Sequence, residues 1–388
     1  MKKQINVAMT CKLMPYYRLG VFQELSKMDG EFKFTFFGDT IKNNGIEPIP
    51  YSYANKKEGG IRWIKTKNYF YKPALLLWQT GIVSEIFKSK YKIFVFEGAV
   101  SHLPIWLFAL LCKIRGKKVV YWTHGNRGVD KGIKKKIRIV FFKWLGDALL
   151  LYGNFQKNIM ANDGYNSEKL HVIYNSLRPN EQFLLMDELQ KSNAKSVSTI
   201  FKNPNLFTLI FIGRLAPEKG VITILETIDK LKKDNILVNC FFIGKGSEQT
   251  EMQNYIDKNG LNDQIHFAGE MYNEKDIAPY FMASNLMISP GNVGLNCIHS
   301  LAYGVPILTH DNFKYQNPEV EAIKNGTTGV FYKHGNFDDL VIKLKETIEN
   351  QLPKDEVVNN CHQVIKEIYN PKNQSECIVS GLKKVMNG

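Results

Sequence analysis

Two cations, Arg214 and Lys219, stand five residues apart in the second half of the chain, between an apolar run that ends at Ile212 and a segment of helical periodicity. A guanidinium presents a fork of N–H donors that matches phosphate oxygens, and an ammonium group adds a compact positive charge. The pair therefore suits a diphosphate. The same spacing also fits a solvated loop in which Glu218 and Lys219 only cap the helix.

Two further loops carry glycines between an apolar run and a helix-like segment: residues 243–248 are IGKGSE and residues 289–295 are SPGNVGL. Gly291 and Gly294 would let the main chain approach a ligand, and amides at the start of the next helix would face an anion. Gly244 and Gly246 form only part of a dinucleotide-binding fingerprint, because a third glycine is missing. Each loop alone also fits a tight turn.

The elements that must position these loops alternate along the whole chain. Short β-rich apolar runs precede longer amphipathic segments, which predicts right-handed βαβ units and an α/β fold of parallel, doubly wound sheets. Ligands bind such sheets outside the carboxyl ends of the strands, where all three loops lie. The predicted strands are residues 5–10, 32–38, 92–97, 118–123, 148–152, 171–174, 207–212, 239–243, 265–267, 286–289 and 306–309.

The length of 388 residues fits two domains. Residues 186–205 are polar, rich in Ser, Asn and Lys, and lack a steady apolar period, so they are the predicted linker between domains 1–185 and 206–373. The last segment, 374–388, places Cys377, Ile378, Leu382 and Val385 on one helical face. That face must be buried, and the first domain is one surface that could cover it.

Charge divides the chain unequally: Lys and Arg outnumber Asp and Glu by 18 over residues 1–180, so the remainder carries −4 of the net +14. Residues 131–144 (KGIKKKIRIVFFKW) predict a helix with cations beside Ile137, Val140, Phe141 and Trp144, as on an anionic membrane surface. A basic and aromatic cluster at 65–72 adds to this pattern. An amphipathic helix with a core-facing apolar side and solvated lysines would look the same.

The six cysteines are scattered singly, without the spacing of zinc ligands. The N-terminus lacks an apolar run like that of a signal peptide, and the longest nearly uncharged apolar stretch, 100–112, is shorter than a membrane span. We therefore expect a cytoplasmic protein without a spanning helix.

Taken together, the loops resemble those of the retaining, nucleotide-sugar-dependent GT-B glycosyltransferases of glycosyltransferase family 4. The resemblance is strongest over residues 211–331, which hold GRLAPEKG, FIGKGSE, IHFAGEM, GLNCIHSLAYGVPILTHDN and NGTTGVFY. Weaker similarities in the first half are MPYYRLGVFQELS, VVYWTHG, DALLLYG and HVIYNSL. The resemblance implies two Rossmann-like domains that face each other across a cleft, the first on the acceptor side and the second binding the nucleotide sugar.

The resemblance also assigns roles to the matching residues. Arg214 and Lys219 would hold the donor diphosphate and stabilise the departing nucleoside diphosphate without a metal ion. His124 would face the transferred sugar, with a capped strand-end histidine as the alternative, and the base would lie along residues 269–272. The donor-side positions are Gly213, Arg214, Lys219, Gly244, Gly246, Met271, Gly291, Asn292, Val293, Gly294, Leu295, His299, Glu319 and Glu321, and the acceptor-side positions are Tyr17, Arg18, Gly20, Glu97 and Asn126.

One departure from the family pattern concerns its two glutamates, eight residues apart, of which the first contacts the donor sugar and the second the ribose. Gly291 and His299 occupy these positions, so both carboxylates are missing. His299 could still hydrogen-bond a ribose hydroxyl, and Glu319 or Glu321 could supply a replacement carboxylate. Alternatively, the backbone amides of residues 292–295 recognise the donor, or the protein is an inactive relative.

These observations predict a metal-independent, retaining glycosyltransferase that needs no cofactor besides its donor, a UDP- or GDP-sugar. The expected acceptor is a saccharide, polyprenyl-linked, in the synthesis of a bacterial-type surface polysaccharide, and the basic half would hold the enzyme peripherally on the inner face of the membrane. A sugar-nucleotide epimerase or a non-catalytic binder is the alternative. Nucleic-acid binding fits the basic half too, but no nucleic-acid-binding motif accompanies it.

Overall fold

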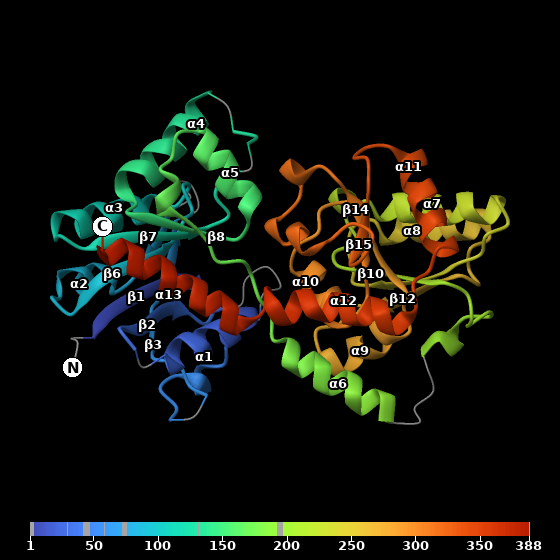
Figure 1. Cartoon of the computed structure of the whole chain (residues 1–388), viewed down its shortest axis with the longest axis horizontal. Coiled ribbons are helices and arrows are strands. Elements are labelled where there is room, and N and C mark those ends of the chain that lie inside the picture. Colours follow the sequence, from blue (N-terminus) through green and yellow to red (C-terminus); the bar gives the residue numbers. More distant parts are fainter. Residues whose placement is uncertain are drawn as a thin grey trace. The chain divides into compact units, whose positions relative to one another are not determined.

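The structure is a computed structural model that describes residues 4–28, 30–41, 47–57, 59–71, 76–126, 128–130, 132–191 and 197–387. The chain divides into two compact units (Figure 1). Unit 1 comprises Met1–Leu177 with Pro371–Gly388, and unit 2 comprises Arg178–Asn370.

Unit 1 is built on a parallel sheet whose order, among the described residues, is β3-β2-β1-β6-β7-β8-β9. Most of its strands are buried over successive residues, as in sheets covered on both faces. Its strands are β1 (Ile5–Leu13), β2 (Phe32–Asp39), β3 (Trp63–Lys65), β6 (Tyr91–Glu97), β7 (Lys118–Thr123), β8 (Ala148–Leu151) and β9 (Leu170–Val172), and β4 (Asn68–Tyr71) and β5 (Leu76–Gln79) form an antiparallel hairpin.

Helices cover both faces of the unit 1 sheet. α1 and α13 pack on one face and share its apolar core, while α2, α3, α5 and a π-helical segment at Val140–Trp144 pack on the other. The π segment continues α4 without a break. The helices are α1 (Leu19–Lys27), α2 (Ile82–Phe87), α3 (Leu103–Ile114), α4 (Gly132–Ile139), α5 (Asn154–Asn162) and α13 (Pro371–Asn387).

Unit 2 repeats the doubly wound scheme. Its described strands follow the order β12-β11-β10-β13-β14-β15, and every neighbouring pair is parallel. The elements are β10 (Thr208–Ile212), β11 (Asn239–Ile243), β12 (Ile265–Gly269), β13 (Leu286–Ser289), β14 (Ile307–His310), β15 (Gly329–Tyr332), α6 (Pro179–Lys191), α7 (Val221–Lys233), α8 (Gln249–Asn259), α9 (Glu274–Met282), α10 (Leu295–Ala302), α11 (Phe337–Glu349) and α12 (Lys354–Glu367). The strand order reverses between β10 and β13, which is where such sheets bind ligands.

The predicted α/β architecture is confirmed, but the division between the units does not fall in the predicted linker, 186–205. α6 begins at Pro179 and packs on α9 and α10, and the Phe201 ring lies 4.6 Å from that of Phe241. Residues 192–196 lie outside the described residues. The predicted linker begins at residue 186, inside α6, and so contains only the end of that helix. This short piece shows no apolar period, although it belongs to unit 2.

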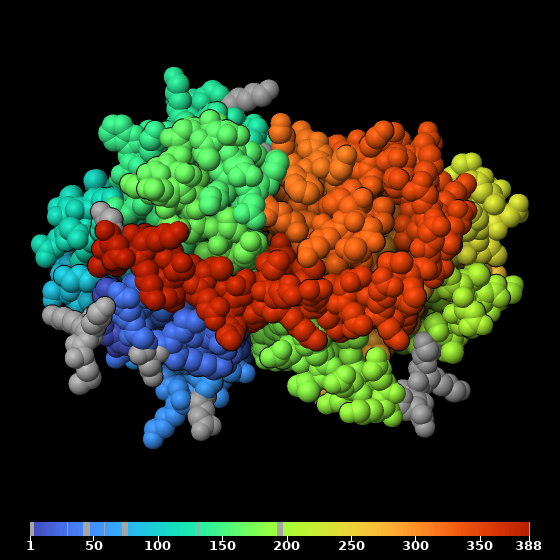
Figure 2. All heavy atoms as spheres, viewed as in Figure 1, coloured from blue at the N-terminus to red at the C-terminus, as the bar shows by residue number. Residues whose placement is uncertain are grey.

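The final helix, α13, completes unit 1. Ile378, Leu382 and Val385 are buried in the core that α1 and the sheet share. In Figure 2 its atoms (dark red) lie between the N-terminal segment (blue) and residues near 150–170 (green). Gly381 permits this approach, because a Cβ there would lie 3.1 Å from side-chain atoms of both His171 and Leu150.

A buried glutamine fixes the start of α13. The Ser176 hydroxyl donates to Gln374 Oε1 at 2.6 Å, and Gln374 Nε2 donates to the Tyr174 carbonyl at 2.9 Å. These bonds tie the segment that leaves unit 1 to the helix that returns to it. Within the described residues, no helix is long and apolar enough to cross a membrane.

Leu382→Ala is expected to lower the free energy of unfolding of unit 1 by about 2–5 kcal/mol, since it opens a cavity in the core under α13. All five tryptophans lie between residues 63 and 144, so tryptophan fluorescence during urea denaturation reports on unit 1. Lys383→Ala, on the exposed side of the same helix, is the matched control and should leave the midpoint unchanged. Equal midpoints for the two variants would contradict the docking of α13.

Candidate functional site

Three loops meet at the carboxyl edge of the unit 2 sheet. The loop after β10, residues 213–220, lies between the loops that follow β11 and β13. The Gly213 amide donates to the Ile243 carbonyl at 3.0 Å, and the Gly291 amide donates to the Lys219 carbonyl at 3.2 Å. The sequence motifs that were separate along the chain therefore form one backbone assembly.

Glycines make this approach possible. A Cβ at Gly244 would lie 1.9 Å from the Gly213 carbonyl oxygen, and one at Gly246 would lie 2.1 Å from the Leu215 carbonyl oxygen. At Gly291 it would lie 2.4 Å from the carbonyl oxygen of Glu218. These glycines are needed for loop-to-loop contact, and at 291 the backbone leaves no room for the glutamate of the family pattern.

Lys219 is the cation that this assembly fixes most firmly. Its Nζ donates to the Asn292 carbonyl at 2.9 Å and to Asn292 Oδ1 at 2.6 Å. Burial, and to a smaller extent the charge of Arg214, lowers the pKa of Lys219 below its ordinary value. An ammonium group held by neutral acceptors keeps its charge available to an anion.

Arg214 lies on the same loop but is open to solvent, with a side chain 77% exposed. Its guanidinium is 3.2 Å from the Glu218 carboxylate, four residues on. Exposed pairs of this kind contribute little free energy, so the guanidinium can turn to an incoming phosphate at small cost.

The amides before α10 are partly engaged. The Val293 amide donates to Gln316 Oε1 at 2.8 Å, and the Gly294 amide donates to Asn296 Oδ1, also at 2.8 Å. Two of the four amides of residues 292–295 already have acceptors within the protein, so recognition of the donor through all four does not fit this arrangement. Side-chain cations have to supply most of the attraction for an anion.

The predicted base loop, residues 269–272, adjoins the loop after β11. The Gly244 amide donates to the Gly269 carbonyl at 2.8 Å. Glu270 forms an ion pair with Lys245 and accepts from the Tyr272 hydroxyl at 2.6 Å, and Met271 is half-buried beside them.

The candidate carboxylates differ from each other in exposure. Glu319 is 3% exposed, in a 3₁₀ turn at Pro318–Ala322 that packs on α10, so a ligand cannot reach it without rearrangement. Glu321 is half-buried on the same turn. The prediction that Glu319 replaces a missing glutamate is wrong for this conformation.

His299 is buried on α10 and faces α9. Its Nε2 lies 3.0 Å from both carboxylate oxygens of Glu274, the first residue of α9. Glu274 is not predictable from the sequence, because nothing in the spacing links it to a histidine 25 residues later.

A cavity of 560 Å³ opens beside the loops that follow β10 and β13. Gly220, Gly291 and Asn292 form one side of it, and His310, Tyr315 and His334 form another. The rings of Tyr315 and His334 stack at 5.3 Å, which offers an aromatic surface next to the glycine at position 291.

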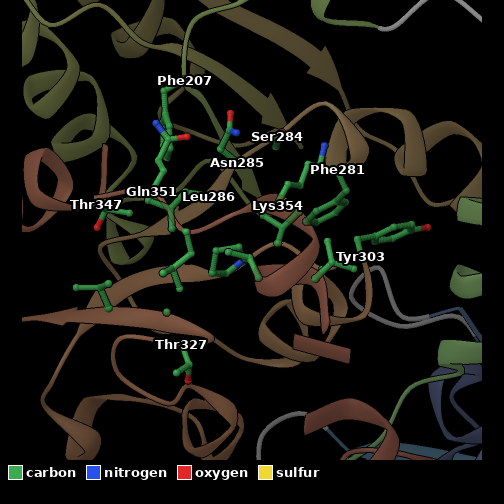
Figure 3. A pocket seen from close by; sticks show the side chains of 18 of the residues that line it. Phe207, Phe281, Ser284, Asn285, Leu286, Tyr303, Thr327, Thr347, Gln351 and Lys354 are labelled. Carbon is green, nitrogen blue, oxygen red and sulfur yellow. The ribbon is translucent and has the colours of Figure 1, made fainter. Parts of the chain in front are cut away.

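Another cavity, of 760 Å³, lies at the opposite edge of the unit 2 sheet, near the amino ends of β10 and β13 (Figure 3). Phe207, Asn285 and Leu286 line it, together with Gln351 and Lys354. Neither the three loops nor the donor-side residues predicted above contribute to this cavity.

In unit 1 a cavity of 380 Å³ lies at the carboxyl ends of β6, β7 and β8 and contains Arg18, Glu97 and His124. Arg18 donates to Glu97 Oε1 at 3.0 Å and to the Tyr152 hydroxyl at 2.9 Å, and its guanidinium lies 4.7 Å from the Trp122 ring. His124 is exposed, with its ring 4.7 Å from that of Tyr152. An ion pair, an imidazole and aromatic rings can together hold a polyhydroxylated ligand.

The remaining acceptor-side residues do not line this cavity. Gly20 is buried in α1, Tyr17 is half-buried in the 3₁₀ turn before it, and Asn126 is buried and donates to Asp163 at 2.7 Å. Asp130 and Arg138, which pair with each other, line the cavity instead. Arg138 belongs to the basic run 131–144, for which a membrane surface was one interpretation, and Asp130 directly precedes that run.

Unit 1 also presents an apolar surface that we call the α3–α4 patch. α3 and α4 with its π continuation lie side by side, since the rings of Trp106 and Phe141 are 4.8 Å apart. Each exposes a stripe of large apolar side chains with Trp144 76% exposed, and the patch comprises Leu103, Leu107, Leu110, Ile114, Ile133, Ile137, Val140 and Trp144.

The predicted face of helix 131–144 is corrected in one respect. Phe141 is fully buried, with its ring 4.5 Å from that of Tyr121, because the π segment lets Phe141 and Phe142 both point inward. Lys134 and Lys136 are exposed beside the patch, whereas Lys131 and Lys72 lie outside the described residues.

Among the described residues, no three His, Cys, Asp or Glu side chains gather as they would around a metal ion.

Comparison with known proteins adds evidence on the family. Residues 192–370 match the family described as glycosyl transferases group 1. The glycosyltransferase MJ1069 of Methanocaldococcus jannaschii is 25% identical over 285 residues, which are 69% of this chain and 68% of that protein.

Two solved structures resemble the fold over nearly the whole chain. A glycosyltransferase from Rickettsia africae has a TM-score of 0.70 at 17% identity, with all of both chains covered. The Anabaena protein HepE in complex with UDP has a TM-score of 0.68 at 14% identity, with 98% of this chain and all of that chain covered. Residues 192–370 therefore resemble the glycosyl transferases group 1 family, and the chain has the GT-B fold of two Rossmann-like halves.

Proposed function

We propose that this glycosyltransferase moves a sugar from a UDP- or GDP-sugar to a saccharide acceptor, with retention of anomeric configuration and without a metal ion. The observation that carries the proposal is the half-buried Lys219, which Asn292 holds at the switch point of the unit 2 sheet. The solvent-exposed charge of Arg214 lies on the same loop. Two cations here stabilise the charge that develops on a departing nucleoside diphosphate. Sugar transfer also agrees with the UDP found in the related HepE structure.

The cavity of unit 1 is the proposed acceptor site. His124 lines it beside the Arg18–Glu97 pair, in the position where the family resemblance expects a group facing the transferred sugar. A polyprenyl-linked saccharide used in surface polysaccharide synthesis is the proposed acceptor. The α3–α4 patch supports this choice, since apolar stripes with flanking lysines suit the surface of an anionic bilayer. We therefore assign the protein a peripheral position on the cytoplasmic face of the membrane.

Replacing both Arg214 and Lys219 by alanine is expected to weaken nucleoside diphosphate binding at least a hundredfold, because two charge-assisted hydrogen bonds, each worth roughly 1.5–3 kcal/mol, are lost. A thermal-shift screen of UDP, GDP and their sugars identifies the nucleotide, and titration calorimetry measures its Kd. Lys258→Ala, on exposed α8, is the control and should bind normally. Undiminished binding by the double variant would show that the diphosphate lies elsewhere.

Three further assays separate the alternatives: product analysis without acceptor, turnover with an acceptor panel, and binding of DNA or RNA at several salt concentrations. An isomerised sugar formed without acceptor would indicate an epimerase, and binding without turnover of any acceptor would indicate a non-catalytic relative. Tight, steeply salt-dependent binding of arbitrary DNA or RNA, with no stabilisation by any nucleotide, would favour the nucleic-acid hypothesis over ours.

His124→Ala should lower kcat for sugar transfer by about a hundredfold or more, as loss of a group at the reacting centre does. The Kd for the nucleotide should stay unchanged, because His124 belongs to unit 1 and the donor site to unit 2. Since His124 is exposed, the melting temperature of the variant should match that of the wild type. Normal transfer by the variant would remove His124 from the site.

The double substitution Ile133→Ala and Trp144→Ala should reduce binding to vesicles of phosphatidylcholine and phosphatidylglycerol by about tenfold or more, because burying large apolar side chains contributes roughly 1.5–3 kcal/mol each. Sedimentation with vesicles measures the partition coefficient, which should also fall as salt rises. Leu352→Ala, an exposed leucine of unit 2, is the control. Equal sedimentation of the double variant and the control would rule out the patch as the membrane contact.

A further inference from the structure

A carboxylate, an imidazole and a phenol meet between α9 and α10. Glu274 Oε2 accepts from the Tyr303 hydroxyl at 2.7 Å, and both of its oxygens lie 3.0 Å from His299 Nε2. Burial alone would raise the pKa of Glu274, but His299, Tyr303 and the positive charge of Arg178 outweigh it, so the pKa lies below the ordinary value. The ionised carboxylate accepts only, and the His299 and Tyr303 groups donate.

This carboxylate is not fully used by its two partners. An ionised carboxylate offers about four lone-pair positions, which is more than two donors require. The Glu274 side chain is 35% exposed, whereas that of His299 is 11% exposed. The pair is therefore closed on its histidine side and open to solvent on its carboxylate side.

The position of the pair is defined by its two helices. His299 follows Leu295, the first residue of α10, by four residues, or about 6 Å along the axis from the loop that contains Asn292. Glu274 comes two residues after Tyr272, at the end of the loop 269–272. The pair thus stands between the loop assembly around Lys219 and the loop after β12.

We infer that Glu274 binds the ribose of the donor nucleotide by accepting hydrogen bonds from its vicinal hydroxyls, and that His299 is the positioning residue that orients the carboxylate. The inference rests on the proposed function, in which the diphosphate lies at Lys219 and the base at residues 269–272. In a nucleoside diphosphate the ribose joins these two groups. Glu274 then supplies from α9 the carboxylate that α10 lacks at position 299, while Glu319 stays buried.

The test is the ratio of two dissociation constants. Calorimetry measures the Kd of UDP or GDP, whichever binds, and of its 2′-deoxy analogue. Wild-type protein should bind the ribonucleotide about tenfold more tightly or better, since a hydrogen bond to a charged group has at least this effect. In Glu274→Gln the preference should fall to about twofold or less.

Glu251→Gln is the matched control, because Glu251 is an exposed carboxylate in the first turn of α8, outside the proposed site, and it should keep the wild-type ratio. His299→Gln should lower the ratio partly, whereas a neutral packing role would leave it unchanged. If Glu274→Gln is too unstable, Glu274→Asp retains the charge but withdraws the carboxylate, and the same loss is expected.

Two results would have different meanings. If both Kd values rise by the same factor in Glu274→Gln, the ratio is preserved and Glu274 is only a clamp between α9 and α10, which overturns the inference. If wild-type protein binds no nucleoside diphosphate at all, the proposed function itself fails.

Discussion

At the carboxyl edge of the unit 2 sheet, carbonyl oxygens of the loop after β10 occupy the space that Cβ atoms of its two neighbouring loops would need. The site depends on this constraint. Gly244, Gly246 and Gly291 let the neighbouring backbones close on the central loop, and Asn292 then holds Lys219 half-buried between them. Under the proposed function, a cation fixed in this way needs no reorganisation when charge develops on a leaving diphosphate, which is the condition for electrostatic catalysis.

Much of the fold could be predicted from the sequence, since in each doubly wound half apolar runs that form buried strands alternate with segments of amphipathic helical periodicity. The predicted bounds of β7, β11 and β13 agree with the structure, because sharp changes in periodicity mark their ends. β3 and β15 were missed because neither is a continuous buried run: β3 buries only Trp63, and the two central residues of β15 are half-buried. α6 was divided because its buried residues are decided by contact with α9, which local sequence does not record.

The candidate site was predictable only where its residues are close in sequence. The loops could be found, but the hydrogen-bond partners of their side chains could not. Lys219 donates to Asn292, which is 73 residues later in the chain, and Arg18 donates to Glu97, which is 79 residues later. The same limit explains why replacements for the missing glutamates were sought at Glu319 and Glu321, whereas the carboxylate beside His299 comes from α9. In the basic helix, the π segment rotated Phe141 into the core, and periodicity of 3.6 residues cannot foresee such a change.

The return of α13 to unit 1 has a consequence for how the chain is made. Ser176 and Gln374, which bond to each other, are 198 positions apart, and all of unit 2 is synthesised between them. On the ribosome, unit 2 is therefore complete while the core of unit 1 still lacks Ile378, Leu382 and Val385. Domains generally fold as units during synthesis, so unit 2 can finish folding first, and unit 1 keeps an open apolar face until α13 has been synthesised.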